Sequence, residues 1–94
     1  MMKKITLIKM QGCPYCAQAF AAIKELKAEY PEFANIEVEI VDKHEDIDRA
    51  KDFADKYYYV PSMFIDGEKM YEASPGESYG ECLLSVKKVF RAAM

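Results

Sequence analysis

The 94-residue sequence has no long apolar segment. In MMKKITLIKM, at its start, Thr6 and Lys9 interrupt the apolar residues, whereas a secretory signal peptide carries roughly 7–15 of them in a row. Nowhere does the chain approach the ~18 consecutive apolar residues that a membrane-spanning helix needs. We therefore expect a cytoplasmic protein without membrane contact, in a compartment where structural disulfides are rare.

Cysteine and histidine are also scarce. The chain has three cysteines, an odd number that fits a disulfide framework poorly, and one histidine, His44. A structural zinc site needs about four ligands, which would take every cysteine together with His44. No second C-x-x-C motif is present, and Cys82 lies in the apolar pattern of the last predicted helix. We therefore expect no bound metal or cofactor, with Cys82 in the core and His44 in a solvated loop.

Basic residues are not in excess. The 13 Lys and Arg residues face 16 Asp and Glu residues, for a net charge of −3, which disfavours nucleic acid as a partner because phosphate binding needs a basic surface. Internal repeats and low-complexity stretches are absent. The hydrophobic fraction of 51% and the charged fraction of 31% are typical of an ordinary globular protein. We expect residues 1–94 to form one domain, and the protein to be a monomer.

Hydrophobic periodicity divides the first half of the chain into strand, helix and strand. Residues 4–10 carry apolar side chains on both faces, which predicts a strand covered on two sides. Residues 14–30 repeat apolar side chains every three or four positions, which predicts a helix with Pro14 in its first turn and Pro31 beyond its end. NIEVEIVD, residues 35–42, alternates as a strand does. The expected apolar face of the helix consists of Cys16, Phe20, Ile23, Leu26 and Tyr30.

The second half continues with a helix, a hairpin and a final helix. Residues 46–57 return to helical spacing, and Asp66-Gly67 is a two-residue hairpin signal between two short strands. Residues 74–77, SPGE, read as a capping box that opens the last helix. The order is β-α-β-α-β-β-α. Because a crossover makes the first two strands parallel and a hairpin is antiparallel, we expect an α/β fold with a mixed four-stranded sheet and helices on both faces.

The sequence GCPYC places Cys13 and Cys16 where the first strand meets the first helix. There Cys13 faces unpaired backbone N–H groups and the positive end of the helix dipole, which stabilise a thiolate. Cys16 lies one turn into the helix and is expected to be less exposed. This asymmetry predicts that Cys13 attacks a disulfide and that Cys16 resolves the mixed disulfide. A C-x-x-C motif in a βαβ context favours such redox chemistry.

The chain resembles the glutaredoxins of the dithiol CPYC type, which have the thioredoxin fold. The resemblance rests on Cys13-Pro14-Tyr15-Cys16, on Val60-Pro61 and on FIDG at residues 64–67, and it covers nearly the whole chain. It implies a thiol–disulfide oxidoreductase that reduces protein or glutathione mixed disulfides. It also implies a cis Val60–Pro61 bond beside the cysteines, with the Val60 backbone open to an extended substrate. The residues that this resemblance and its groove assign to substrate binding are Pro14, Tyr15, Tyr59, Val60 and Pro61.

The sequence departs from the glutaredoxin pattern in the region that would hold glutathione. Met10 replaces a basic residue, Tyr59 replaces a threonine, and Tyr71-Glu72 replaces the two glycines near the γ-glutamyl end of glutathione. We therefore expect weaker glutathione use, with either glutathione as co-substrate or a flavoprotein disulfide reductase as the electron source. Three alternatives stay open: a thioredoxin-like redoxin served by a thioredoxin-reductase-type enzyme, a module that binds a metal or an iron–sulfur cluster, and a structural adaptor.

Overall fold

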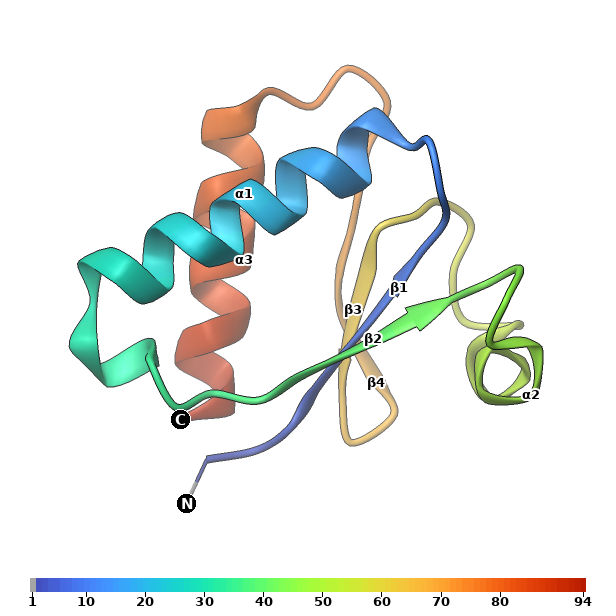
Figure 1. Ribbon diagram of the computed structural model, residues 1–94, viewed down its shortest axis with the longest axis horizontal. Helices are drawn as coiled ribbons and strands as arrows, with labels where there is room; N and C mark the ends of the chain where they lie inside the picture. The colour runs from blue at the N-terminus through green and yellow to red at the C-terminus, as the bar shows by residue number, and fades with distance from the viewer. Residues whose placement is uncertain (1) are drawn as a thin grey trace.

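The structure is a computed structural model that describes residues 2–94, and it has the predicted order of elements (Figure 1). The strands are β1 (Ile5–Lys9), β2 (Val38–Asp42), β3 (Ser62–Ile65) and β4 (Glu68–Glu72). The helices are α1 (Pro14–Glu29), α2 (Ile47–Ala50) and α3 (Tyr79–Ala93), with 3₁₀ turns at Pro31–Phe33 and Lys51–Phe53. None of the helices described is long and apolar enough to cross a membrane.

The four strands form one mixed sheet in the order β2-β1-β3-β4. β1 runs parallel to β2, in a register that pairs Lys9 with Asp42, and antiparallel to β3. β3 and β4 form the predicted hairpin, in which Asp66 and Gly67 have φ values of 52° and 81°. Positive φ at both central residues is the signature of a type I′ turn, whose twist matches that of the strands. The predicted mixed four-stranded sheet is thereby confirmed.

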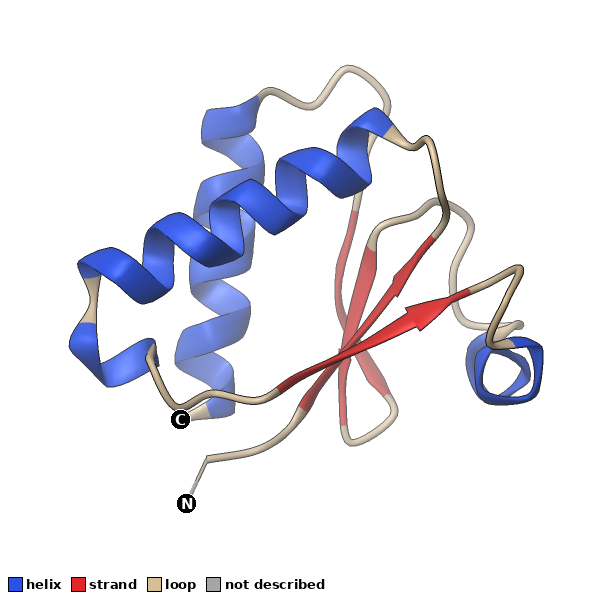
Figure 2. Cartoon of the chain, viewed as in Figure 1, coloured by secondary structure: helices blue, strands red, loops and turns tan. Residues whose placement is uncertain are grey.

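The sheet is covered on both sides (Figure 2). α1 and α3 lie on one face, and the short α2 lies on the other. The central strand β1 serves both layers, as its sequence predicts: Ile5 and Leu7 belong to the core under α1 and α3, and Ile8 belongs to the core under α2. Cys13 and Cys16 lie in the second core, at the end of the molecule where β1 runs into α1.

Two of the predicted helices differ in detail. The buried side of α1 is formed by Cys16, Ala19, Ala22 and Leu26, whereas Phe20 and Ile23 are only partly buried. Alanines of the same helical period fit the contact with α3, so the larger side chains lie at its flanks. The helix predicted over residues 46–57 is shorter: α2 ends at Ala50 and a 3₁₀ turn follows to Phe53. Only Ala50 and Phe53 of this segment are fully buried, with Tyr57 partly buried against the second core, so little packing supports a longer helix.

The last helix begins later than predicted. Pro75 and Gly76 form a turn in which Glu77 N donates to the Ser74 carbonyl at 3.0 Å and Gly76 has a φ of 82°, the geometry of a type II turn. The capping box expected at residues 74–77 is therefore wrong. The helix is capped instead at Ser78, whose side chain accepts from Glu81 N while the Glu81 carboxylate accepts from Ser78 N.

Candidate active site

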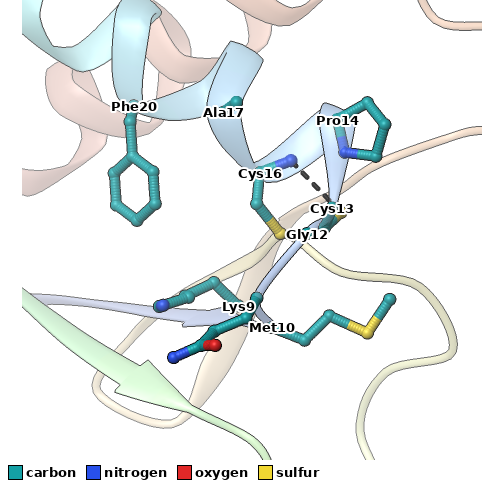
Figure 3. Close-up of a pocket in the computed structure, with 9 residues that line it drawn as sticks. Lys9, Met10, Gly12, Cys13, Pro14, Cys16, Ala17 and Phe20 are labelled. Carbon is teal, nitrogen blue, oxygen red and sulfur yellow. Dashed lines mark hydrogen bonds between the residues drawn. The ribbon is translucent and has the colours of Figure 1, made fainter.

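Cys13 is the N-cap residue of α1. Its backbone is extended, with φ −89° and ψ 114°, and Pro14 takes the first helical position. The Cys13 sulfur accepts a hydrogen bond from Cys16 N at 3.3 Å, shown as the dashed line in Figure 3. Sulfur thus takes the place of the oxygen that usually caps a helix, and it faces the N-terminus of a helix of 16 residues.

Cys16 differs from Cys13 in its surroundings. Its side chain is 2% exposed, against 9% for Cys13, and both cysteines are free thiols. Burial, together with a hydrogen bond to Cys13, raises the pKa of Cys16 to about 12, although a backbone hydrogen bond with Met10 and the charge of Lys9 act in the opposite direction. Cys16 is therefore protonated at neutral pH.

Val60 and Pro61 lie directly against this pair. The peptide bond between them is cis, as the resemblance implies. The Cys13 sulfur donates to the Val60 carbonyl at 3.6 Å, and the Pro61 carbonyl accepts from Ala73 N at 3.0 Å, so the segment is held between the nucleophile candidate and the end of β4. The structure thus brings together four of the predicted site residues, Cys13, Cys16, Val60 and Pro61, which come from two separate parts of the sequence.

The other predicted binding residues surround this centre. Pro14 is exposed, and Tyr59 is half exposed with its ring 6.0 Å from that of the fully exposed Tyr58. Tyr15 is half-buried, and its hydroxyl accepts from Gly76 N at 2.7 Å. The site therefore has an aromatic rim on the Tyr59 side and a bridged rim on the Tyr15 side.

A cavity of ≈ 460 Å³ opens beside both sulfurs. Figure 3 shows the Phe20 ring hanging from α1 at one side of this cavity, with Lys9 and Met10 across from it at the end of β1. Its walls are mostly apolar, so it is suited to an apolar side chain of a bound partner. No local sequence pattern predicts this cavity, because it depends on how α1 lies over the end of β1.

Lys9 is held by a buried acidic partner, Asp42, which was not among the predicted site residues. The Lys9 ammonium lies 3.1 Å from the Asp42 carboxylate, which is almost fully buried. The backbone N–H of His44 is the main cause that lowers the pKa of Asp42, and Lys9 contributes to the same effect. The sequence contains a pattern that predicts this pair, because Lys9 and Asp42 are the last residues of two neighbouring parallel strands and lie opposite each other in register.

Glu72 ties β4 to the segment that precedes Pro61. Its carboxylate accepts from the backbone N–H groups of Tyr58 and Tyr59, each at 2.6 Å, and pairs with Lys69. Burial acts to raise the pKa of Glu72, but Lys69 and the two N–H groups outweigh it, and the pKa is lowered. The charge of Glu72 is therefore balanced within the fold by Lys69 and the two backbone N–H groups.

Tyr71, the other residue aligned with the family's glycines, is a core residue. It is 7% exposed, and its hydroxyl donates to the Glu77 carboxylate and contacts the Cys82 sulfur at 3.5 Å. Burial raises the pKa values of both Tyr71 and Cys82. Cys82 is fully buried and His44 is exposed in its loop, as expected. Within residues 2–94, no three or more His, Cys, Asp or Glu side chains cluster as a metal site.

Comparisons with known proteins identify the family of this chain. A model of the glutaredoxin family matches residues 5–70, a range that includes both cysteines of the motif and Val60–Pro61. This chain belongs to the glutaredoxin family. Membership of this family supports the prediction that the chain is a thiol–disulfide oxidoreductase. A search of curated proteins found no match to the chain.

Among solved structures, this glutaredoxin is similar to thioredoxin 1 from the thermophilic eubacterium Thermosipho africanus TCF52B. The identity is 18% and the TM-score 0.54, over 95% of this chain and 96% of that one. At this identity the similarity concerns the fold alone.

Proposed function

We propose that this protein reduces disulfides in extended polypeptide segments by a dithiol mechanism, with Cys13 as the nucleophile and Cys16 as the resolving thiol. The observation that carries the proposal is the asymmetry of the pair. Cys13 caps the helix and keeps 9% of its surface exposed, whereas Cys16 is 2% exposed and has its pKa raised to about 12. The attacking thiol must be accessible to the substrate disulfide, and the resolving thiol must stay protonated until the mixed disulfide has formed. Cys13 is the more exposed of the two and Cys16 the more buried, so their positions suit these roles.

The reaction proceeds in two exchanges. The Cys13 thiolate attacks one sulfur of the substrate disulfide; a bond forms between the two sulfurs, the substrate S–S bond breaks, and the other substrate sulfur leaves as a thiolate that takes up the Cys16 proton. Cys16 then attacks the Cys13 sulfur, and the second substrate sulfur leaves and is protonated from solvent. The substrate gains two electrons, and the protein is left with a Cys13–Cys16 disulfide.

Two features support a polypeptide substrate. The Val60 backbone lies 3.6 Å from the Cys13 sulfur, so a chain that pairs with Val60 in strand fashion brings its own sulfur to Cys13. The exposed rings of Tyr58 and Tyr59 adjoin Val60 and offer apolar surface to such a chain. Two equivalents of glutathione, or a flavoprotein disulfide reductase, would return the oxidised pair to the dithiol.

The test is a trapping experiment with a disulfide-bearing peptide. Cys16→Ser should accumulate a mixed disulfide between the peptide and Cys13, detected by mass spectrometry, whereas Cys13→Ser should trap nothing. Cys82→Ser is the matched control and should turn over the peptide as the native protein does. Oxidised protein should then be offered glutathione with its reductase and, separately, thioredoxin reductase. A peptide trapped on Cys16 in the Cys13→Ser variant would overturn the assignment of roles.

A further inference from the structure

Two side chains of α1 bridge the active-site helix to the loop that leads into α3. The Tyr15 hydroxyl accepts from Gly76 N at 2.7 Å, and the Gln18 amide donates to the Glu77 carbonyl at 3.3 Å. Figure 1 shows this loop arching beside the first turn of α1. One of the two bridging residues, Tyr15, lies between Cys13 and Cys16 in the sequence, so any change at Tyr15 acts at the edge of the site.

The loop has no free backbone donors at three consecutive positions. Gly76 N donates to the Tyr15 hydroxyl, Glu77 N donates to the Ser74 carbonyl at 3.0 Å, and Ser78 N donates to the Glu81 carboxylate at 3.0 Å. Successive N–H groups that run into a helix N-terminus are otherwise a common way to bind a carboxylate. Here the chain fills this row with its own acceptors.

The same rim carries negative charge. The Glu77 carboxylate accepts from the Tyr71 hydroxyl, and the Glu81 carboxylate closes the capping box at the start of α3. A ligand that carries carboxylates would find the backbone N–H groups of residues 76–78 already occupied. Its negative charge would also be repelled by the carboxylates of Glu77 and Glu81.

This rim lies where a group held on Cys13 would extend. Tyr15 is two residues from Cys13, and Ala73 N donates to the Pro61 carbonyl, so the loop starts directly beside Pro61. A group joined to Cys13 that lies along Val60–Pro61 therefore reaches the loop within a few residues. A polypeptide segment arrives there with neutral backbone, whereas glutathione arrives with free carboxylates.

We propose that Tyr15 is a specificity-determining residue, whose hydroxyl occupies the Gly76 N–H and thereby makes the chain favour polypeptide disulfides over glutathione mixed disulfides. The proposal rests on the proposed function, and it assigns that function a substrate preference. Phenylalanine at position 15 keeps the ring, removes the acceptor and leaves the Gly76 N–H available to a ligand.

The experiment compares KM for two substrates in the native protein and in Tyr15→Phe. One substrate is a small glutathione mixed disulfide and the other is a peptide disulfide without glutathione, each measured with the same dithiol reductant. The ratio of the glutathione KM to the peptide KM should fall about three- to tenfold in Tyr15→Phe, as expected for one recovered hydrogen bond, with the ratio of kcat values unchanged. In ¹⁵N NMR titrations, S-methylglutathione should shift the Gly76 amide in Tyr15→Phe and leave it unmoved in the native protein.

Tyr79→Phe is the matched control. The Tyr79 hydroxyl also joins α3 to α1, by donating to Glu25 at 2.9 Å, but it does so farther along α1 from the cysteines. It should cost similar stability and leave the KM ratio at the native value. An unchanged ratio in Tyr15→Phe, or an equal change in both variants, overturns the role of Tyr15. Failure of the proposed function would look different, because neither substrate would then be reduced.

Discussion

At the scale of single residues, one turn of helix separates two thiols of different chemistry. Cys13 caps α1 and contacts both Cys16 N and the Val60 carbonyl, so its sulfur is in polar contact on two sides. Cys16 lies behind it in apolar surroundings, where the cost of burying a charge favours the thiol form. The proline between them starts the helix and so sets the angle at which the two sulfurs are presented. The division of roles that we propose thus follows from position along one helix.

Alkylation should reveal this difference between the thiols. With limiting iodoacetamide at pH 7, we expect modification at Cys13 and protection of Cys16 and Cys82, because burial raises the pKa values of the last two. Peptide mapping by mass spectrometry gives the order of reaction, and alkylation in denaturant provides the control in which all three react alike. Modification of Cys16 ahead of Cys13 in the folded protein would contradict the expectation.

At the scale of elements, two loops border the site, and side chains from a strand and a helix hold them in place. The segment before Pro61 is held by a side chain from β4, and the loop before α3 is held by a side chain from α1. Both contacts join backbone N–H groups to side-chain oxygens across large sequence separations. The sheet and the helices set the distances between the cysteines and the two loops. The polar contacts of Glu72 and Tyr15 then fix how far each loop lies from the cysteines.

Glu72 is expected to position the Tyr58–Val60 segment. Glu72→Ala removes the acceptor for two backbone N–H groups, and we expect a loss of about 1.5–3 kcal/mol in the free energy of unfolding, the range for hydrogen bonds to a charged group. We also expect a several-fold lower kcat/KM for the peptide disulfide, because Val60 is no longer held against Cys13. Urea unfolding and steady-state kinetics measure the two effects.

Glu68→Ala is the matched control, since Glu68 is exposed at the other end of β4. It should change neither stability nor kcat/KM appreciably. If Glu72→Ala lowers stability but leaves kcat/KM at the native value, Glu72 acts on the fold alone and its positioning role is excluded.

At the scale of the whole molecule, the sequence was sufficient for the architecture and for the central pair but not for the rims. The order of elements and the type I′ turn follow from local periodicity and from Asp66-Gly67, which are short-range signals. The capping box was misplaced by four residues because Ser74 and Ser78 both precede a glutamate by three positions, and only the type II turn at Pro75–Gly76 distinguishes them. The contacts made by Glu72 and Tyr15 join residues 13 or more positions apart, and no local pattern encodes them.

Alkaline pH should destabilise the whole molecule through buried acids in both layers of the core. Cys16 lies in the layer under α2, and Cys82 and Tyr71 lie in the layer under α1 and α3. All three have raised pKa values, so the folded state keeps their protons at a pH where the unfolded chain has released them. The stability that they contribute is fully present below the unfolded pKa, 9.0 for the cysteines, and is lost as the pH rises above it.

We therefore expect the free energy of unfolding to be flat near neutral pH and to fall above pH 9, by on the order of 1 kcal/mol per pH unit for each group that titrates. Urea unfolding of the reduced protein at a series of pH values measures the slope. The Cys16→Ala, Cys82→Ala double variant should be less stable at neutral pH but should show a shallower decline just above pH 9. A slope equal to that of the native protein would mean that these thiols do not carry the alkaline loss, and that their burial does not control their protonation.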